Sequence, residues 1–327
     1  MNLKCARYLI NIPWGIKSDN IMFGGQICGI LLSKIIRENS SKLINMQPNS
    51  LEINFIKPTY VKNYYCAKNF KSCPLEKQNI CYEIENIKKF APFREDFTAD
   101  FSQITNKKEK EITANLKVSF VKNKNNFSEN LLNNQNPLLK VDNYNFKDIA
   151  EYFKEKSVNE KEIENLKKND TILKTEILIS ADKTPGERFF RFKLKNPKNI
   201  QNNNDIIPEN MNLENKSIFI SYVSDFLFIE PALNKIKEIK KIKESLEYYS
   251  EKIETFRTLS FKIDFLSFDF NDCLYIKSNC FSVKKYTDDT NDKHKNCFQI
   301  ECEGDIFNNK GVNLAKITQK AFLKLKK

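Results

Sequence analysis

Apolar and polar residues follow two different periods in the first part of the chain. In GGQICGILLSKIIRE, residues 24–38, apolar side chains recur at the period of a helix. In NSLEINFIKPTY, residues 49–60, apolar and polar side chains alternate as in a strand, and the same alternation returns in residues 96–104 and 112–121. The pattern predicts a buried helix followed by antiparallel strands, with residues 67–92 as an insertion.

The same order of elements recurs in the second part of the chain. Two alternating segments, residues 175–180 and 188–195, predict strands. The apolar run of residues 217–224 then leads into a helix predicted to start at Asp225 and to extend through a Lys-rich stretch to Glu254. Four more alternating segments complete the series, at residues 257–268, 273–283, 297–307 and 312–326. A repeated order of elements indicates two copies of one supersecondary unit.

The two copies predict a division of the chain into residues 1–122 and 171–327. Residues 123–170 between them are rich in Asn and Lys and are predicted to be a linker. Within this linker, residues 147–156 form either a stable amphipathic helix or a transient one. Each copy should wrap its strands around its helix, which gives an α+β fold. The two sheets can join into one continuous sheet, because this removes exposed edge strands.

The formal net charge of +12 is compatible with a phosphate-rich partner, such as nucleic acid, an anionic membrane or a nucleotide cofactor. The basic residues are nevertheless scattered among 42 acidic ones, and the frequent Lys, Asn and Ile are typical of AT-rich codons. No recognisable nucleic-acid-binding pattern accompanies them. We therefore interpret the charge mainly as codon bias and expect no nucleic-acid partner.

We expect an intracellular, cytoplasmic protein with reduced thiols, because the sequence shows no recognisable targeting signal and the cysteine spacing fits no disulfide scaffold or metal site. The nine cysteines include no CxxC pair, so their spacing fits neither a zinc site nor a redox motif. The N-terminal MNLKCARYLINIPWG lacks the apolar core of a signal peptide. No run approaches the ~20 apolar residues that span a bilayer. The C-terminal LKLKK is not the SKL peroxisomal address.

The single histidine restricts the chemistry. His294 lies in the charged segment DDTNDKHKN, which is typical of a solvated loop. Hydrolases that use Ser-His-Asp or Cys-His need their histidine in a shaped, partly buried site. If the protein is an enzyme, its base is therefore a carboxylate or a bound water.

Five segments in the same order resemble motifs of the acyl-CoA thioesterase II family, whose members are fused double hot-dog proteins. MFGGQICGILLSKI resembles the family's V-F-G-G-Q helix opening, and NSLEINFIKP resembles its H-S-x-H-x-x-F-L-R-P strand. RFFR from Arg188 resembles an R-x-W-x-R stretch, and SYVSDFLF resembles the Y-A-S-D motif. GVNLAKITQKAFLK aligns without a gap on the final strand, D-G-x-L-V-A-S-x-x-Q-E-G-x-x-R. The resemblance covers most of residues 5–122 and 171–325.

This resemblance implies a double hot-dog fold, with two helix-wrapped antiparallel sheets joined into one continuous sheet. It also implies an active site in which an Asp, a Thr or Ser, and a Gln hold the attacking water. Asp225 falls on the Asp of the Y-A-S-D motif, Thr258 on the hydroxyl position after the helix, and Gln319 on the Gln of the last strand. The substrate-binding turn that opens the first helix corresponds to Gly24, Gly25 and Gln26. The resemblance implies neither a metal nor another cofactor.

The chain departs from the family pattern at several positions. The family has histidines where Asn49 and Glu52 stand, and D-H-S where Ser260, Phe261 and Lys262 follow the threonine. These departures affect the acyl pocket and the substrate preference more than the water site.

The sequence pattern itself supports two of the three site residues. Alternation in the last strand places Gln319 on the apolar face, where a buried amide needs partners. Gln319 could equally be a core residue that caps a backbone group. At a helix start, Asp225 would be kept ionised by the positive helix end, or would serve only as an N-cap.

The remaining site residues have weaker support from the pattern. The assignment of Thr258 rests on the resemblance, because Leu259 and Phe261 define the apolar face of that strand without it. Gly24 and Gly25 could form a tight turn, or could let a thioester approach backbone N–H groups.

The resemblance therefore implies an acyl-CoA thioesterase of fatty acid metabolism that hydrolyses its substrate with a water activated by Asp225. Two alternatives stay open: a non-catalytic acyl-CoA-binding hot-dog protein, and a nucleic-acid-binding protein that uses a Lys-rich surface. The expected partner is an acyl-CoA substrate, and the sequence is compatible with a homo-oligomer.

Overall fold

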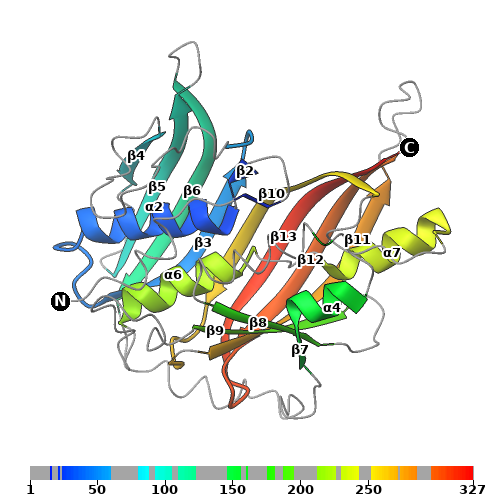
Figure 1. Cartoon of the computed structure of the whole chain (residues 1–327). Coiled ribbons are helices and arrows are strands. Elements are labelled where there is room, and N and C mark those ends of the chain that lie inside the picture. The colour runs from blue at the N-terminus through cyan, green and yellow to red at the C-terminus, as the bar shows by residue number, and fades with distance from the viewer. Residues whose placement is uncertain are drawn as a thin grey trace.

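The computed structural model describes residues 15–16, 21–22, 24–59, 80–87, 93–104, 110–122, 146–155, 160, 175–180, 187–194, 212–225, 230–242, 252–271, 273–285 and 296–326. Within these residues, an 11-stranded antiparallel sheet has the order β4-β5-β6-β3-β10-β13-β12-β11-β9-β8-β7. The short strands β1 (Gly15–Ile16) and β2 (Ile21–Met22) pair separately. Helices α2 and α6 lie side by side across one face of the large sheet (Figure 1).

The first half of the sheet consists of β3 (Met46–Phe55), β4 (Ile80–Ile87), β5 (Arg94–Ile104) and β6 (Lys110–Lys122). Helix α2 (Gly24–Glu38) packs on it and buries the predicted apolar stripe of Ile27, Leu31 and Ile35. The helix and three of the strands are confirmed as predicted. Strand β4 was not predicted, because it lies within the segment that we interpreted as an insertion.

The second half of the sheet confirms the alternating segments of the sequence. It contains β8 (Thr175–Ser180), β9 (Glu187–Leu194), β10 (Ile253–Phe265), β11 (Cys273–Lys285), β12 (Cys297–Phe307) and β13 (Asn313–Leu325). Strands β10 and β3 pair directly, so the two halves share one continuous sheet.

The prediction of one helix from Asp225 to Glu254 is wrong at both its start and its end. Helix α6 (Leu213–Val223) lies before Asp225, and helix α7 (Glu230–Lys240) lies after it. Asn212 caps the start of α6 by accepting a hydrogen bond from its first turn. The apolar run inside α6 is buried all round, and such a run has no period that separates a buried helix from a strand. The predicted extension to Glu254 fails because α7 ends at Lys240 and β10 has begun by Ile253.

Irregularities in the strand pairing recur at corresponding places in the two halves. The β3–β6 ladder has a bulge between Pro48 and Ser50, and the β10–β13 ladder has one between Thr258 and Ser260. A second bulge recurs in the same way in the β5–β6 and β12–β13 ladders. Because bulges are specific features of a strand, their shared placement supports the interpretation of a repeated unit.

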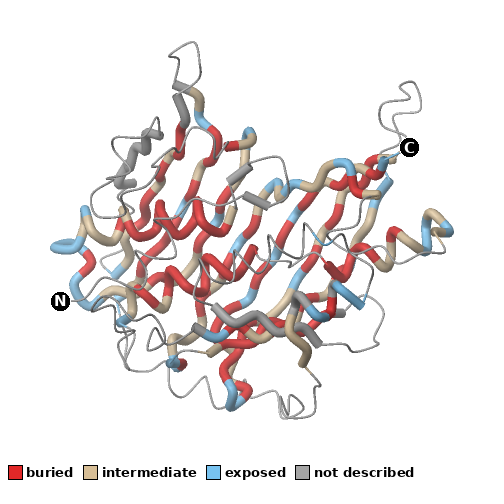
Figure 2. The backbone as a smooth tube through the Cα atoms, viewed as in Figure 1, coloured by how far each residue is buried: buried red, intermediate tan, exposed pale blue. Residues whose placement is uncertain are grey.

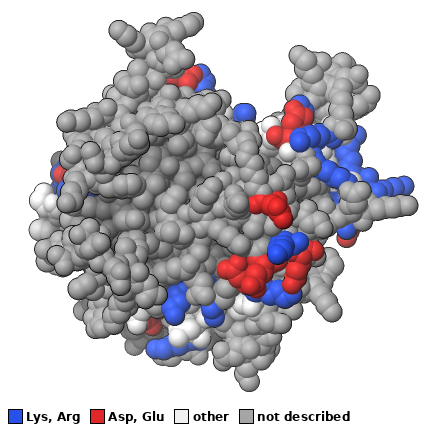
Figure 3. Space-filling view, viewed as in Figure 1, with Lys and Arg blue, Asp and Glu red and all other residues white. Residues whose placement is uncertain are grey.

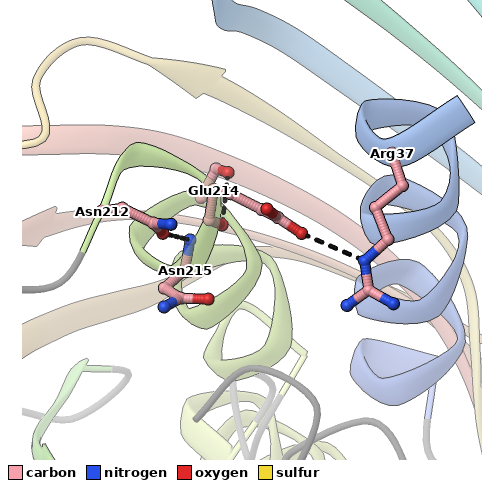
Figure 4. A network of polar contacts seen from close by, with 5 residues as sticks. Arg37, Asn212, Glu214 and Asn215 are labelled. Atoms are coloured by element: carbon pink, nitrogen blue, oxygen red, sulfur yellow. Dashed lines mark hydrogen bonds and ion pairs between the residues drawn. The ribbon is translucent and has the colours of Figure 1, made fainter. Parts of the chain in front are cut away.

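The helices α2 and α6 run antiparallel, as contacts at both ends of the pair show. At one end, the Gly25 amide donates to the carboxylate of Asp225, just beyond α6. At the other end, Arg37 of α2 donates to Glu214 of α6 with 3.4 Å between Nε and Oε1 (Figure 4). Both helices are buried along most of their length (Figure 2). The helix pair therefore forms the centre of the core, and contacts at both ends hold the two helices together.

Ordered structure also occurs inside the segment predicted as a linker. Strand β7 (Phe146–Asp148) pairs with β8 at the sheet edge, and helix α4 (Ile149–Glu155) follows it directly. Tyr152 of α4 is buried, so this short helix packs on the domain. The Asn-rich residues 123–145 lie outside the described residues. In the part of the chain that the structure describes, no helix is long and apolar enough to cross a membrane.

Exposed lysines on the strands pair with acidic neighbours. Lys262 lies 2.9 Å from Asp264, and Lys324 lies 2.6 Å from Glu254. On the face shown in Figure 3, acidic and basic side chains likewise lie next to each other over much of the described surface. Mixed pairs of this kind are typical of a solvated face.

Candidate active site

Three polar side chains from separate elements meet at one point of the molecule. Thr258 on β10 donates from Oγ1 to Asp225 Oδ1 at 2.7 Å. Gln319 on β13 donates from Nε2 to the same carboxylate oxygen at 2.6 Å and to Thr258 Oγ1 at 3.0 Å. The structure thus brings together the three residues that the sequence singled out, within mutual hydrogen-bonding reach.

Asp225 owes its position to two helices rather than one. It follows the C-terminal end of α6, where Ser224 donates from its hydroxyl to the Ile220 carbonyl and helps to end the helix. The expectation that Asp225 starts its own helix is therefore wrong. The positive helix end is nevertheless present, because the first turn of α2 faces the carboxylate and Gly25 N lies 3.1 Å from Oδ2.

Gly24 is required by the close approach of this turn. A Cβ at Gly24 would lie 2.5 Å from Asp225 Oδ2 and 2.7 Å from the ring of Phe55. Side chains do not tolerate such distances, so any other residue would displace the carboxylate or the ring. The sequence alone left open whether this glycine served a turn or a site, and the structure shows that it makes room for Asp225.

A bulge in β10 directs Thr258 into the site. The pairing with β13 shifts between Thr258 and Ser260, so that Leu259 occupies an extra position. Leu259 is 40% exposed, whereas Phe261 is buried. The sequence placed Leu259 on the apolar face by strict alternation, which is wrong because the bulge interrupts the alternation. The same interruption explains why Thr258 faces inward without any signal in the pattern.

Gln319 lies on the buried face of β13, as its alternation predicted. Its side chain is 2% exposed, and its Nε2 is shared between Asp225 and Thr258. Its Oε1 has no hydrogen-bond partner among the described residues. A buried oxygen without a partner is costly unless a ligand or water supplies a donor, so this atom is a ready acceptor within the site.

The carboxyl group of Asp225 is strongly affected by its surroundings. Burial raises its pKa from 3.8 to about 7, because the charged form loses contact with water. Hydrogen bonds from Thr258, Gly25, Gly24 and Gln319 favour the charged form and limit this rise. A carboxyl with a pKa near neutrality can accept and release a proton at the pH of most cells, as a general base must.

The other residues predicted from the sequence fall around this point or outside the described part of the chain. Gln26 is fully buried one residue beyond Gly25, and none of the bonds among the three polar side chains involves it. His294 lies outside the described residues.

Two residues near the carboxylate were not predicted from the sequence. The ring of Phe55 stands against Gly24 and packs on Phe261, with 5.9 Å between ring centroids. The Cys28 thiol on α2 is hydrogen-bonded to Ser221 on α6, and burial raises its pKa well above the usual range. Phe55 lies in the alternating pattern of β3, and Cys28 lies in a helix that is apolar almost all round at its start, and both patterns also describe ordinary core residues.

No protein-family model matches the sequence, and no curated protein sequence matches it. The structure, however, is similar to several solved structures. An acyl-CoA thioesterase II from Mycobacterium marinum has a TM-score of 0.55 and 13% identity, with 98% of this chain and 97% of that chain covered. A tesB protein from Mycobacterium avium subspecies paratuberculosis has a TM-score of 0.53 and 11% identity, with 94% of this chain and 89% of that chain covered.

A third similar structure is a conserved protein of unknown function with a hot-dog fold from Alicyclobacillus acidocaldarius. Its TM-score is 0.55 and its identity 12%, with 95% of this chain and 90% of that chain covered. Identities this low establish the fold alone. The chain therefore has the α+β hot-dog fold, and its resemblance to acyl-CoA thioesterase II proteins holds at the level of the fold.

Proposed function

We propose that this chain is an acyl-CoA thioesterase built as a double hot-dog, with residues 1–122 and 171–327 as its two units. It hydrolyses fatty acyl-CoA to a free fatty acid and coenzyme A. The observation that carries the proposal is the buried carboxylate of Asp225, which accepts hydrogen bonds from Thr258 and Gln319 and lies at the N-terminal end of α2. The acyl-CoA thioesterase activity named for the structurally similar protein from Mycobacterium marinum agrees with this site.

The proposed reaction needs only water and the side chains of the site. Asp225 in its ionised form accepts a proton from a water, and the Gln319 Oε1 atom accepts the hydrogen bond of the water's other hydrogen. The water oxygen attacks the thioester carbonyl, and the bond from carbon to sulfur breaks. The thiolate of coenzyme A leaves and takes up the proton from Asp225, so that a carboxylic acid and a thiol are formed.

The turn that opens α2 is the proposed binding place for the reacting group of the substrate. It comprises Gly24, Gly25 and Gln26. Backbone amides and the positive end of a helix stabilise negative charge, which develops on the carbonyl oxygen during attack. The amide of Gly25 also holds Asp225 in place, so the same turn positions both the base and the carbonyl.

A covalent mechanism through the nearby thiol has less support. Cys28 lies close to Asp225, but burial raises the pKa of its thiol, so the thiol stays protonated. A thiol in that state is a poor nucleophile, which favours direct attack by water.

The proposal is tested by measuring free thiol released from acyl-CoA substrates of graded chain length with the purified full-length chain. We expect turnover with at least one chain length. Binding of acyl-CoA without release of thiol at any length would instead support the non-catalytic acyl-CoA-binding alternative.

The role of the carboxylate is tested with Asp225→Asn, which preserves the shape of the side chain but removes the base. We expect kcat to fall by the ~10²–10⁴-fold that general bases contribute. Asp264→Asn is the matched control, because Asp264 lies on the same strand as Thr258 and, among the residues that the structure describes, forms only an exposed ion pair with Lys262. An Asp225→Asn variant as active as the control would overturn the assignment.

A further inference from the structure

Two buried cysteines face each other in the second half of the sheet. Cys280 on β11 and Cys302 on β12 are direct partners in the antiparallel ladder. Both are free thiols and both are fully buried. The described ladders place no other cysteine opposite a cysteine: Cys297 faces Lys324, and Cys273 faces Lys193.

The two thiols already interact in the reduced protein. A side-chain hydrogen bond joins Cys302 and Cys280, and the Cys280 thiol donates to the Ser282 carbonyl oxygen with 3.6 Å between sulfur and oxygen. The ammonium group of Lys235 donates to the Cys280 carbonyl and therefore stands beside this thiol. The bond from Cys302 and the charge of Lys235 lower the pKa of Cys280, whereas the pKa of Cys302 is raised by the same bond and by burial.

The register of the two cysteines is compatible with a disulfide. Directly opposed residues in antiparallel strands have Cα atoms about 4.5 or 5.5 Å apart. Disulfides join residues whose Cα atoms are about 4.4–6.8 Å apart, so the Cα spacing of such a directly opposed pair lies in the range that a disulfide needs. A bulge between Cys280 and Ser282 interrupts the ladder at this point and leaves Phe281 51% exposed. Interrupted pairing favours local opening, which gives small molecules access to a buried group.

We propose that Cys280 and Cys302 form a redox-active pair, which a hydroperoxide converts into an intramolecular disulfide. The Cys280 thiolate attacks one oxygen of hydrogen peroxide, which breaks the O–O bond and leaves a sulfenic acid and, after protonation, water. The Cys302 sulfur then attacks the sulfenic sulfur, and a second water leaves. Two thiols and one peroxide thus give one disulfide and two waters.

The cysteine pair lies next to the candidate active site. Cys302 is also the direct partner of Gln319 on β13, so the three residues form a row across neighbouring strands. Residues in such a row share one face of the sheet. The redox pair therefore lies on the buried face beside Gln319.

The proposal is tested by treating the reduced, folded full-length chain with hydrogen peroxide, blocking the remaining thiols after denaturation, and mapping peptides. Cleavage at Lys277 and Lys284 isolates Cys280, and cleavage after Glu301 separates Cys302 from Cys297. We expect a linked peptide pair, lighter by two hydrogen atoms, that contains Cys280 and Cys302. Dithiothreitol should restore both thiols.

Variants assign the linkage and its order of reaction. Cys280→Ser should abolish the linked peptide and leave Cys302 alkylatable, whereas Cys302→Ser should leave a sulfenic acid at Cys280 that a dimedone probe traps. Cys297→Ser is the matched control and should keep the link. If a variant fails to fold, the map of the parent chain decides alone. Unlinked Cys280 and Cys302 after peroxide, or links mainly to other cysteines, would overturn the proposal.

Discussion

At the scale of single residues, Asp225 is subject to two opposing influences. Burial raises its pKa to about 7, whereas the hydrogen bonds of Thr258, Gln319 and the glycine turn stabilise its anion. The balance leaves the carboxylate ionised in part near neutral pH and basic enough to take a proton from water. A solvent-exposed aspartate, with a pKa near 3.9, would be ionised but a much weaker base.

The pH dependence of the proposed hydrolysis should follow this group. We expect kcat/KM to rise as pH increases through about 7 and to level off above it, because only the ionised carboxylate acts as the base. The measurement is initial thiol release across buffers of constant ionic strength. A rate independent of pH in this range would contradict the assignment of Asp225.

The same pKa should be visible in stability. A carboxyl with a pKa of 3.8 when unfolded and about 7 when folded contributes stability below the lower value, and this contribution is lost as pH rises through the higher one. Asp225→Asn lacks this titration. The unfolding free energy of the variant should therefore improve relative to the parent as pH rises from acid to neutral, as urea denaturation measures.

A methyl group at position 24 should damage the site more than the fold. Gly24→Ala places a Cβ against both the Asp225 carboxylate and the Phe55 ring. A displacement of about 1 Å at a reacting group can cost ~10²-fold in rate, and we expect a loss of that order in kcat. Ser33→Ala in the same helix is the control, since the buried Ser33 hydroxyl has no partner among the described residues. Equal activity of the two variants would show that the turn does not position Asp225.

At the scale of elements, the bulge in β10 decides which side chains face the site. It turns Thr258 toward Asp225 and leaves Leu259 on the exposed surface. Leu259→Lys should therefore change the unfolding free energy by no more than about 0.5 kcal/mol. Ile263→Lys, on the same strand but fully buried, should unfold the protein or nearly so, because it buries a charge. Thermal unfolding of the two variants is the measurement, and comparable losses would contradict the bulge.

The sequence predicted those elements whose period is expressed over their whole length. Helix α2 and most strands have such a period, and Gln319 could be placed on the buried face of β13 for the same reason. Helix α6 could not be predicted, because its residues 217–223 are buried on every side and have no period that separates a helix from a strand. Thr258 could not be placed by its pattern either, since one extra residue reverses the alternation and only the pairing with β13 reveals it.

At the scale of the whole molecule, the site is assembled from both halves of the chain. The first half supplies the glycine turn of α2, and the second supplies Asp225, Thr258 and Gln319. The bulges in β3 and β10 align the two halves of the sheet, and this alignment identifies the residues of the first half that correspond to Thr258 and Gln319. Pro48 corresponds to Thr258. Leu51 pairs with Val118 in the first half as Phe261 pairs with Gln319 in the second, so Val118 corresponds to Gln319. The side chains of Pro48 and Val118 have no hydrogen-bond donor or acceptor with which to hold a water.

We therefore expect one catalytic centre per chain. Titration calorimetry with a non-hydrolysable acyl-CoA analogue should give one bound molecule per chain, and Gln319→Leu should weaken this binding. Two equivalent sites, or binding that is unaffected at position 319, would contradict the assignment of the single centre.

The two ends of the α2–α6 helix pair carry different residues, which is possible because both halves belong to one chain. At one end the pair presents Asp225 to Gly25, and at the other it is closed by Arg37 and Glu214. In an assembly of two identical subunits, symmetry would impose the same residues on both ends, and any mutation would act twice. A single chain that carries both halves is free of this constraint. One end can specialise in chemistry while the other specialises in cohesion, and each can then change in evolution without its counterpart.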